Sequence, residues 1–412
     1  MKDVVIVGGG VSGFTTAQEL RRLGYAGRLR VVEPQGLPYD RPPLSKNYLD
    51  GSLPPGEIFF AGEGWFAEHA VELIEDRVES LDAAAGRVRL SGGSSLDADA
   101  VVLATGGNPR SLPIPGGDDP GLLLLRTRAD ADRLRVHVGP GRHLVVVGAG
   151  LIGAEVASSA TKLGTEVTLV DPFAVPGVPA LGLTIAAELH AMHRRHGVRA
   201  LTAPTASIER AGEGWLLRLG QPAADGTETV EADAVLMAVG IAPELSLAVS
   251  AGLEVDNGVL VDAGQRTSNP WIYAVGDIAR HCLPDGALTL RHEHWDSAMH
   301  GAQVAAAAIL GHDLPAPAAP WFWTDRHGVH VEATGSMLGG REVVRERDGR
   351  PWLAFAVGDD QRLLGAAGIE PGQAIRAARR MIEHGTVIDP EQLADPGVDL
   401  KRLARAPKGT DG

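Results

Sequence analysis

The sequence predicts an α/β fold with two similar strand–turn–helix–strand units, followed by a separate α+β domain. Short β-branched runs alternate with helical patterns through the first three hundred residues, and such alternation is typical of layered α/β structure. The order strand, glycine-rich turn, helix, strand, acid occurs twice, over 4–33 and 144–171. A proline-rich run at 314–320 precedes a different pattern. The 412 residues are also too many for one compact core.

The individual elements follow from the periodicity of the apolar residues. Apolar β-branched runs predict buried parallel strands at 29–32, 101–104, 144–147 and 167–170. Between them, helical patterns predict helices over 14–23 and 154–163. Beyond the proline-rich run, strands are expected at 329–332 and 352–357, a helix at 373–383, and a frayed tail at 406–412.

These patterns give three domains. The first is discontinuous, with residues 1–112 and 234–312, because the second repeat is inserted into it. The second domain spans 113–233, and its start at 113–120 is rich in Pro, Gly and Asp, as a crossing between domains would be. The third, α+β domain spans 313–412.

Composition and charge exclude several functional classes. A formal net charge of −14 argues against nucleic acid as a partner, because neutralising phosphates requires clustered Lys and Arg. No apolar run approaches the roughly 18 residues of a membrane span, and the first strand begins where a secretory signal would stand. The single cysteine, Cys282, excludes an intramolecular disulfide. We therefore expect a soluble, cytoplasmic protein, either a monomer or a homodimer.

The first glycine turn has the spacing of a dinucleotide-binding turn and comprises Gly8, Gly10, Val11, Ser12 and Gly13. The first glycine allows the tight turn, the second lets the backbone approach a pyrophosphate, and the third permits close packing of helix on strand. Glu33 follows at the end of the next strand, where a carboxylate accepts hydrogen bonds from a ribose. A glycine-rich turn without a ligand would not explain this acid.

The second turn repeats the arrangement and comprises Gly148, Gly150, Leu151, Ile152 and Gly153. Asp171 follows eighteen residues later, and a carboxylate in that position binds ribose hydroxyls and repels a 2′-phosphate. No Lys or Arg occurs from 172 to 193 to bind such a phosphate, so NADH is favoured over NADPH. Two dinucleotide sites in one chain predict a flavin and a nicotinamide, which exchange electrons directly.

Several further segments resemble one family. They are 37–46 (LPYDRPPLSK), 104–110 (ATGGNPR), 267–270 (TSNP), 274–277 (AVGD), 293–295 (EHW) and 320–323 (PWFW). In this order and combination they resemble the FAD-dependent NADH:ferredoxin reductases of bacterial oxygenase and cytochrome P450 systems, the family of putidaredoxin and rhodocoxin reductases. The resemblance covers nearly the whole chain.

The resemblance implies a fold and an activity. The fold would contain two Rossmann-like domains of the glutathione reductase type, binding FAD and NADH, with a C-terminal α+β interface domain. The activity would be that of an oxidoreductase that takes a hydride from NADH. Single electrons would then pass to a ferredoxin, of the [2Fe–2S] or another iron–sulfur type, that serves an oxygenase or a P450.

The resemblance also implies roles for individual residues. Lys46 would lie at the reactive edge of the flavin, paired with Glu155 in catalysis. Arg41 would contact the phosphates or the adenosine end of FAD, and the backbone of Val78 would contact its adenine. An ordinary ion pair and a solvated turn residue are the plain alternatives for Lys46–Glu155 and for Arg41.

The remaining implied contacts are to the flavin and its ribityl-phosphate chain. Thr105 and Arg126 would line the flavin or its ribityl-phosphate chain, Asp277 would bind a ribityl hydroxyl, and Trp295 and Trp323 would flank the isoalloxazine. Asp277 follows a predicted strand, where α/β proteins bind ligands, although it could also cap a helix. The two tryptophans could be plain core residues. Further cofactor contacts are expected from Ala104, Gly106, Gly240, Gly276, Glu293 and His294.

The sequence departs from the family pattern at three places. Residues 172–176 are uncharged where a basic residue is usual after the second ribose acid, Met299-His300 stands where a Gln is usual, and Asp325-Arg326 replaces Asp-Gln. The last two departures suggest an unusual partner. We expect the ferredoxin to dock through Arg and His groups around Arg291, Arg326 and the third domain, with a rate that falls as salt rises.

Three other features carry weaker alternatives. His190, His193 and His196 fall three residues apart, whereas helical metal sites prefer a spacing of four, so a solvated face and no metal site are expected. Cys282 lies far from the position at which thiol-dependent relatives carry a cysteine. On the same scaffold, an NADH oxidase using oxygen or quinone, or a binding protein controlled by flavin state, would be the alternative functions.

Overall fold

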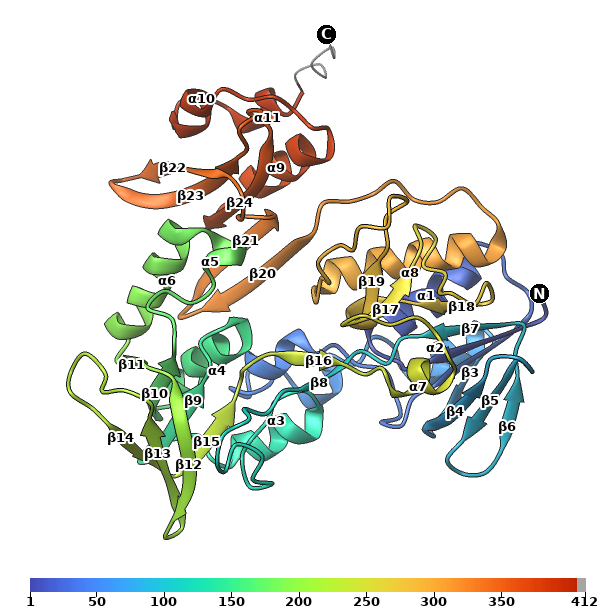
Figure 1. Cartoon of the computed structure of the whole chain (residues 1–412), viewed down its shortest axis with the longest axis horizontal. Helices are drawn as coiled ribbons and strands as arrows, with labels where there is room; N and C mark the ends of the chain where they lie inside the picture. Colours follow the sequence, from blue (N-terminus) through green and yellow to red (C-terminus); the bar gives the residue numbers. More distant parts are fainter. Residues whose placement is uncertain (406–412) are drawn as a thin grey trace. The chain divides into compact units, whose positions relative to one another are not determined.

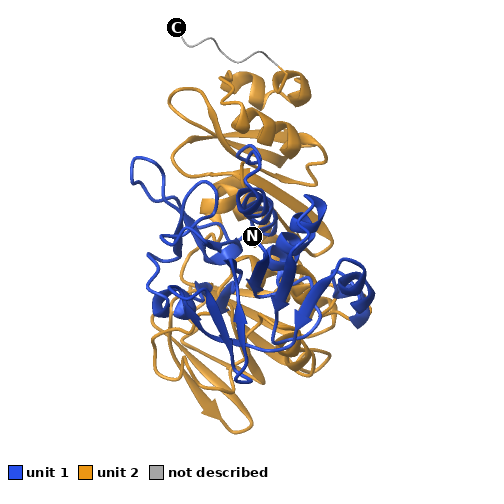
Figure 2. Cartoon of the chain, turned by 90° about the vertical axis from the view of Figure 1, so that its right-hand side faces the viewer, with its two compact units in different colours: residues 1–41, 55–108, 241–318 blue, residues 42–54, 109–240, 319–412 orange. Residues whose placement is uncertain are grey.

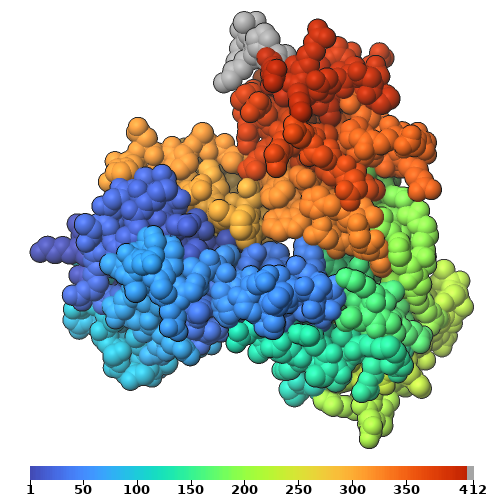
Figure 3. Space-filling model, turned by 180° about the vertical axis from the view of Figure 1, so that it is seen from behind, coloured from blue at the N-terminus to red at the C-terminus, as the bar shows by residue number. Residues whose placement is uncertain are grey.

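The computed structural model (Figure 1) describes residues 1–405 and divides into two compact units (Figure 2). Unit 1 comprises 1–41, 55–108 and 241–318, and unit 2 comprises 42–54, 109–240 and 319–412. Unit 1 largely follows the discontinuous first domain, whereas unit 2 combines the other two with residues 42–54. The division into three domains stays a prediction, and the tail expected to fray lies outside the described residues. Figure 3 shows the surface in the colours of the sequence.

A parallel five-stranded sheet is the centre of unit 1. Its strand order is β18-β7-β1-β2-β3, formed by β1 (Asp3–Val7), β2 (Arg28–Val32), β3 (Val71–Ile74), β7 (Ala100–Leu103) and β18 (Ile272–Ala274). The helices α1 (Val11–Arg22) and α8 (Trp295–Leu310) pack against each other beside this sheet. Four buried alanines of α8, at positions 302, 305, 306 and 308, allow that close approach.

Smaller elements surround this sheet. They are α2 (Glu63–Glu68), α7 (Ser246–Ser250), the 3₁₀ helices η2 (Pro55–Ile58) and η3 (Gly276–Ile278), the antiparallel strands β4 (Val78–Asp82), β5 (Arg87–Leu90) and β6 (Ser95–Asp97), and the short strands β8 (Gly107–Pro109), β16 (Ile241–Pro243), β17 (Val259–Val261) and β19 (Ala279–His281).

Unit 2 contains a second parallel sheet, of order β11-β10-β9-β15. It is formed by β9 (His143–Val147), β10 (Glu166–Asp171), β11 (Arg199–Thr202) and β15 (Ala234–Met237). The helices of this part are α3 (Arg128–Arg135), α4 (Leu151–Lys162), α5 (Val178–Leu181) and α6 (Leu183–Arg195), and the 3₁₀ helix is η1 (Pro42–Ser45). An antiparallel sheet of β12 (Thr205–Ala211), β13 (Gly214–Leu219) and β14 (Thr229–Ala232) packs beside them.

The C-terminal part of unit 2 is an antiparallel sheet of order β20-β21-β24-β23-β22. Its strands are β20 (Trp321–Arg326), β21 (Val329–Gly335), β22 (Arg341–Arg347), β23 (Arg350–Val357) and β24 (Leu363–Ile369), and its helices are α9 (Ala374–Glu383), α10 (Pro390–Ala394) and α11 (Leu400–Leu403). Buried Arg345 donates to the carbonyl oxygens of Gln392, Leu393 and Val398 and so fixes the α10 segment to the sheet.

The fold class expected from the sequence is confirmed. The predicted strands at 29–32, 101–104, 144–147 and 167–170 correspond to β2, β7, β9 and β10, each within one residue at either end. All are buried runs rich in β-branched residues in parallel sheets, which is why the sequence predicts them well. The helix expected at 373–383 is α9.

Candidate functional site

Three glycines of the first turn, between β1 and α1, meet different physical demands. Gly8 has a φ of +103°, and a Cβ there would overlap the carbonyl oxygen of Ala104. A Cβ on Gly13 would overlap the carbonyl oxygen of Gly8, so this glycine allows the helix to lie on the turn. By contrast, no atom lies within 4 Å of a Cβ built on Gly10, which leaves its backbone open to a ligand.

The second turn, between β9 and α4, has the same geometry. Gly148 has a φ of +99°, and a Cβ there would overlap the carbonyl oxygen of Ala238. A Cβ on Gly153 would overlap Gly148, whereas Gly150 again has open space around it. In both turns, therefore, the first and third glycines allow close backbone packing, and the second leaves the backbone open to a ligand.

The amides at the start of both helices are left for a ligand. The N-cap residues of α1 and α4 are Gly10 and Gly150, and neither helix has a side-chain cap. In α3, by contrast, Thr127 and Asp130 form a reciprocal capping box. Uncapped N–H groups beside an open glycine backbone are what an anionic pyrophosphate needs.

Glu33, at the end of β2, is fixed by the backbone of its own unit. The N–H of Gly9 donates to Oε2 at 2.7 Å and the N–H of Gln35 donates to Oε1 at 3.0 Å. The residue as a whole is 8% exposed, and these bonds hold its charge at the edge of the sheet beside the turn.

Asp171, at the end of β10, is held in the same way. The N–H of Ala149 donates to Oδ2 at 2.8 Å, and the N–H of Phe173 donates to Oδ1 at 2.9 Å. Each carboxylate oxygen has further lone pairs that can accept from ribose hydroxyls. Both turns, with their acids, thus fit a dinucleotide.

Asp277 is brought to the first turn by a close approach of two backbones. Gly276 has a φ of +74°, and a Cβ there would lie 2.6 Å from the Oγ of Ser12. Only glycine fits, and η3 therefore begins directly beside the start of α1. Arg291 donates to the carbonyl oxygen of Asp277 at 2.6 Å, which fixes the segment further.

A second cluster lies wholly within unit 2 and is centred on the buried carboxylate of Glu155, on α4. Ser45 donates to its Oε2 at 2.5 Å, and Thr324 donates to its Oε1 at 2.7 Å. The Nζ of Lys46 lies 3.4 Å from the same Oε1 and 3.1 Å from the Oδ2 of Asp325. Lys46 thus links a buried carboxylate to a half-exposed one.

The ammonium group of Lys46 also lies beside aromatic rings of β20. Its Nζ is 5.3 Å from the centre of the Trp323 ring, within cation–π range, and Trp323 stacks on Trp321 at 5.3 Å. Asp325 accepts from His330 at 2.7 Å across the β20–β21 pair, and this hydrogen bond lowers the pKa of Asp325 against the effect of its burial.

Comparison with known proteins identifies the family. Residues 2–306 match the family described as pyridine nucleotide-disulphide oxidoreductase, and residues 321–404 match the reductase C-terminal family. The chain belongs to the pyridine nucleotide-disulphide oxidoreductase family. Membership implies FAD and NAD(H) as cofactors, which the two turns fit.

The most similar family members include components of oxygenase systems. The ferredoxin–NAD(+) reductase subunit of the benzene 1,2-dioxygenase system of Pseudomonas putida is 38% identical over 98% of both chains. Rhodocoxin reductase of Rhodococcus erythropolis is 33% identical, over 99% of this chain and 96% of its own. The resemblance seen in the sequence is therefore confirmed.

Solved structures of family members agree with the fold. Putidaredoxin reductase, in its covalent complex with putidaredoxin, has 32% identity and a TM-score of 0.90 over 98% of both chains. The ferredoxin reductase for the CYP199A2 system from Rhodopseudomonas palustris also has 32% identity, with a TM-score of 0.91 over 98% of this chain and 100% of its own.

Other residues expected from the family resemblance in unit 1 lie as follows. The indole N–H of Trp295 donates to Asp40 at 3.0 Å, within the loop that carries Arg41. Thr105 donates to the carbonyl oxygen of Glu244 at 3.0 Å. Val78 begins β4 and is buried, and Ala104 and Gly106 follow β7.

The loop before α8 contains a charged pair and a buried imidazole. Glu293 forms an ion pair with Arg291 at 2.7 Å. His294 is the N-cap residue of α8, and burial, with the neighbouring His292, lowers its pKa to about 4. Their contacts to a cofactor remain predictions.

Two predicted site residues belong to unit 2 but lie outside the Lys46 cluster. The N–H of Arg126, just before α3, donates to the carboxylate of Asp130 at 3.2 Å. Gly240 has a φ of +100°, and its carbonyl oxygen accepts from the N–H of Arg110. The roles of all these side chains toward FAD or NADH remain predictions.

The prediction that Arg291 and Arg326 help to dock the ferredoxin is wrong, because both side chains are buried. Arg326 is 6% exposed, and its burial lowers its pKa to about 10; the side chain of Arg291 is 5% exposed. Neither guanidinium can meet a partner at the surface. Their burial depends on residues distant in sequence and therefore could not be predicted from the local pattern.

The expectation of a solvated histidine face on α6 is also wrong. His190 and His193 are 7% and 1% exposed, and only His196 is exposed. The Nδ1 of His193 lies 2.9 Å from the Nε2 of His327, in the β20–β21 turn, and His327 stacks on His196 at 4.2 Å. Among residues 1–405, no group of three or more side chains is arranged to hold a metal ion.

Sequence reasoning missed most of the groups around Glu155. Ser45, Thr324 and Asp325 come from segments that are distant in sequence and meet only in the folded chain; Lys46 and Asp325, for example, are 279 residues apart. The alternation of β20 was the one available signal, because it places Thr324 on the buried face and Asp325 on the other.

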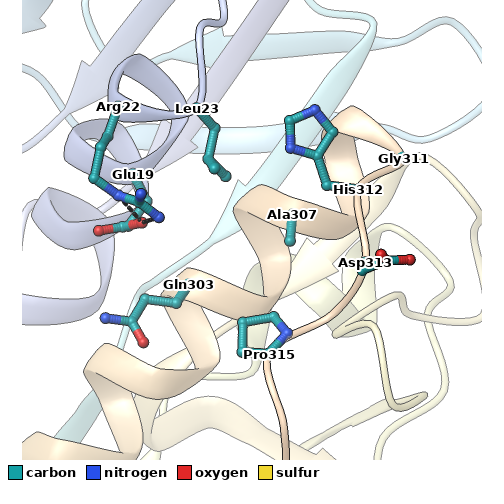
Figure 4. Close-up of a pocket in the computed structure, with 9 residues that line it drawn as sticks. All are labelled: Glu19, Arg22, Leu23, Gln303, Ala307, Gly311, His312, Asp313 and Pro315. Atoms are coloured by element: carbon teal, nitrogen blue, oxygen red, sulfur yellow. Dashed lines mark hydrogen bonds and ion pairs between the residues drawn. The ribbon is translucent and has the colours of Figure 1, made fainter.

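Unit 1 also has an open pocket of about 840 Å³ at the C-terminal ends of α1 and α8 (Figure 4). Its lining includes the ion pair of Glu19 and Arg22, together with His312 and Asp313. Helix C-termini present carbonyl oxygens, which do not favour a phosphate, and the glycine turn lies at the opposite end of α1. This pocket is therefore separate from the dinucleotide turn.

Within the described part of the chain, no helix is both long and apolar enough to cross a membrane.

Proposed function

We propose that this protein carries electrons from NADH through bound FAD to a ferredoxin that serves an oxygenase or a cytochrome P450. The observation that carries this proposal is the full-length similarity, at 38% identity over 98% of both chains, to a ferredoxin–NAD(+) reductase subunit. The paired glycine turns support it, because such a reaction needs two dinucleotides in one chain.

We assign FAD to the first turn, with Gly10 opposite its pyrophosphate, Glu33 on its adenosine ribose and Asp277 on its ribityl chain. Bound FAD supplies the conversion between a two-electron donor and a one-electron acceptor. The contacts around Glu33 and Asp277 support the assignment, because they fix the carboxylate of Glu33 and the backbone of Asp277 beside the turn.

We assign NADH to the second turn, with Asp171 on its adenosine ribose. The carboxylate would repel a 2′-phosphate, and residues 172–193 contain no Lys or Arg to offset that repulsion. NADH is therefore the proposed donor rather than NADPH.

We assign Lys46 and Glu155 to the electron-transfer step. The ammonium group would stabilise negative charge on the reduced flavin. Its two carboxylate partners support this role, because they hold the cation in one place. For the acceptor we propose a [2Fe–2S] ferredoxin, and for the compartment the cytoplasm, which fits a chain with a single cysteine.

Anaerobic mixing with NADH tests the proposal. We expect yellow protein that bleaches with NADH and is reduced much more slowly by NADPH. Reduction of cytochrome c should then rise at least tenfold when a [2Fe–2S] ferredoxin is added. In a separate assay in air, NADH turnover that does not depend on ferredoxin but consumes oxygen would favour an NADH oxidase instead.

A further inference from the structure

Phe173 is the most exposed large apolar side chain in the described part of the chain. It is 71% exposed, and every other aromatic side chain among residues 1–405 is buried or half-buried. Single exposed apolar residues are common on protein surfaces, so exposure alone identifies no site. Phe173, however, lies beside the acid of the second glycine turn, and this position suggests a function for the exposed ring.

The backbone of Phe173 is fixed to the second ribose acid. Its N–H donates to Oδ1 of Asp171 at 2.9 Å, while Oδ2 accepts from Ala149 in the glycine turn. Pro172 stands between the two residues and restricts the backbone further. The ring is therefore held two residues from the carboxylate that we assign to the adenosine ribose.

The first turn offers an internal comparison, because Gln35 stands in the equivalent place after Glu33. The N–H of Gln35 donates to its acid at 3.0 Å, as that of Phe173 does. However, the side-chain oxygen of Gln35 accepts from the hydroxyl of Tyr39 at 2.5 Å, so this side chain is engaged within unit 1. Among the described residues of unit 2, by contrast, no aromatic ring stacks on Phe173.

We infer that Phe173 is the adenine-binding residue of the second turn, stacking its ring on the base of NADH. An aromatic face binds a base through its π surface and needs no hydrogen bond. The residue also adds to donor choice, because it occupies with an uncharged ring the region where a 2′-phosphate would need a cation. The inference rests on the proposed assignment of NADH to this turn.

Equilibrium binding measurements distinguish the contribution of the base to affinity from that of the rest of the nucleotide. With the flavin-loaded protein, we expect Phe173→Ala to raise the dissociation constants of 5′-AMP and of ADP-ribose about tenfold, within the range of a lost base–aromatic stack. Phe173→Trp should bind both ligands as tightly as the wild type or more tightly. Val136→Ala, at a 69% exposed apolar side chain on α3, should bind them unchanged.

Reduced nicotinamide mononucleotide, which lacks the adenosine, provides the second readout. Its rate of flavin reduction should be the same for Phe173→Ala and for the wild type. Dissociation constants of 5′-AMP within twofold of the wild type would overturn the inference, and so would an equal loss of rate with the mononucleotide. Wild-type protein that binds neither 5′-AMP nor ADP-ribose would instead refute the assignment of NADH to this turn.

Discussion

Individual glycines in the two turns are required for different reasons. Gly13 and Gly153 have no room for a methyl group, because a backbone carbonyl already occupies the space. Gly10 and Gly150 have room for a methyl group, and the lack of a side chain there instead lets a ligand approach the backbone. The sequence pattern alone cannot make this distinction, since all four glycines satisfy it equally.

This difference predicts unlike outcomes for two alanine substitutions. Gly10→Ala should fold with wild-type circular dichroism but lose at least tenfold in FAD affinity, because the added methyl group meets the pyrophosphate and no protein atom. Gly13→Ala should instead destabilise the fold by several kcal/mol, roughly 3 or more, through overlap with Gly8. Flavin absorbance and thermal unfolding measure the two effects, and equal behaviour of both variants would contradict the distinction.

The buried pair of Lys46 and Glu155 should be strongly coupled. Their side chains are 15% and 5% exposed, so water screens them little. In a double-mutant cycle with Lys46→Met and Glu155→Gln, we expect a coupling free energy of about 1–3 kcal/mol, measured by denaturant unfolding.

A surface pair gives the matched control. Arg87 and Asp97 lie 3.0 Å apart, but they are 56% and 79% exposed. Arg87→Met with Asp97→Asn should show a coupling of about 0.5 kcal/mol or less. Similar couplings for both pairs would show that burial does not strengthen the Lys46 pair.

At the scale of elements, the sequence predicts regular structure better than it predicts contacts between elements. The strands β2, β7, β9 and β10 could be predicted because each is a short, largely buried run rich in apolar and β-branched residues. The burial of His193 was not readable, because it depends on the turn between β20 and β21, more than 130 residues further along the chain. A local histidine pattern therefore indicated a solvated face where the fold forms an interior contact.

The contact between α6 and the β20–β21 turn should make stability depend on pH. Burial lowers the pKa of His327 to about 4 and that of His193 to about 2, and nearby His196 and Arg326 act in the same direction. An unfolded histidine titrates near 6.5, so the unfolded state binds more protons between pH 6.5 and 4. This contribution is fully present above pH 6.5 and is lost as the pH falls toward 4.

His327→Asn tests this dependence. Asn tolerates the positive φ of +51° at this position but does not titrate. The fall in unfolding temperature between pH 7.5 and pH 5 should be smaller than in the wild type. His384→Asn, at an exposed position after α9, should keep the wild-type slope. An unchanged slope for His327→Asn would remove His327 as a cause.

At the scale of the whole molecule, each unit contains a complete glycine turn and its acid. Gly10 and Glu33 lie in unit 1, and Gly150 and Asp171 lie in unit 2. The linear order of the repeats predicted two dinucleotide sites, and the family comparison confirms both cofactors. The assignment of residues 42–54, with Lys46, to unit 2 could not be predicted, because these residues follow the first repeat in the chain.

This arrangement predicts that nucleotide binding by unit 2 survives the loss of flavin. Protein stripped of FAD should bind ADP-ribose within threefold of the affinity of the loaded protein, by calorimetry. Conversely, Gly150→Ala should retain its full flavin content while its dissociation constant for ADP-ribose rises at least tenfold. Joint loss of both ligands in Gly150→Ala would contradict the independence of the two turns.

The anchoring of Glu33 and Asp171 by amides of their own loops has a practical consequence for engineering. Because backbone amides hold each acid, the backbone around it can stay intact while the side chains that follow it are exchanged. The specificity for the electron donor can thus be changed by substituting a few residues after the acid, beginning with residues 172 and 173.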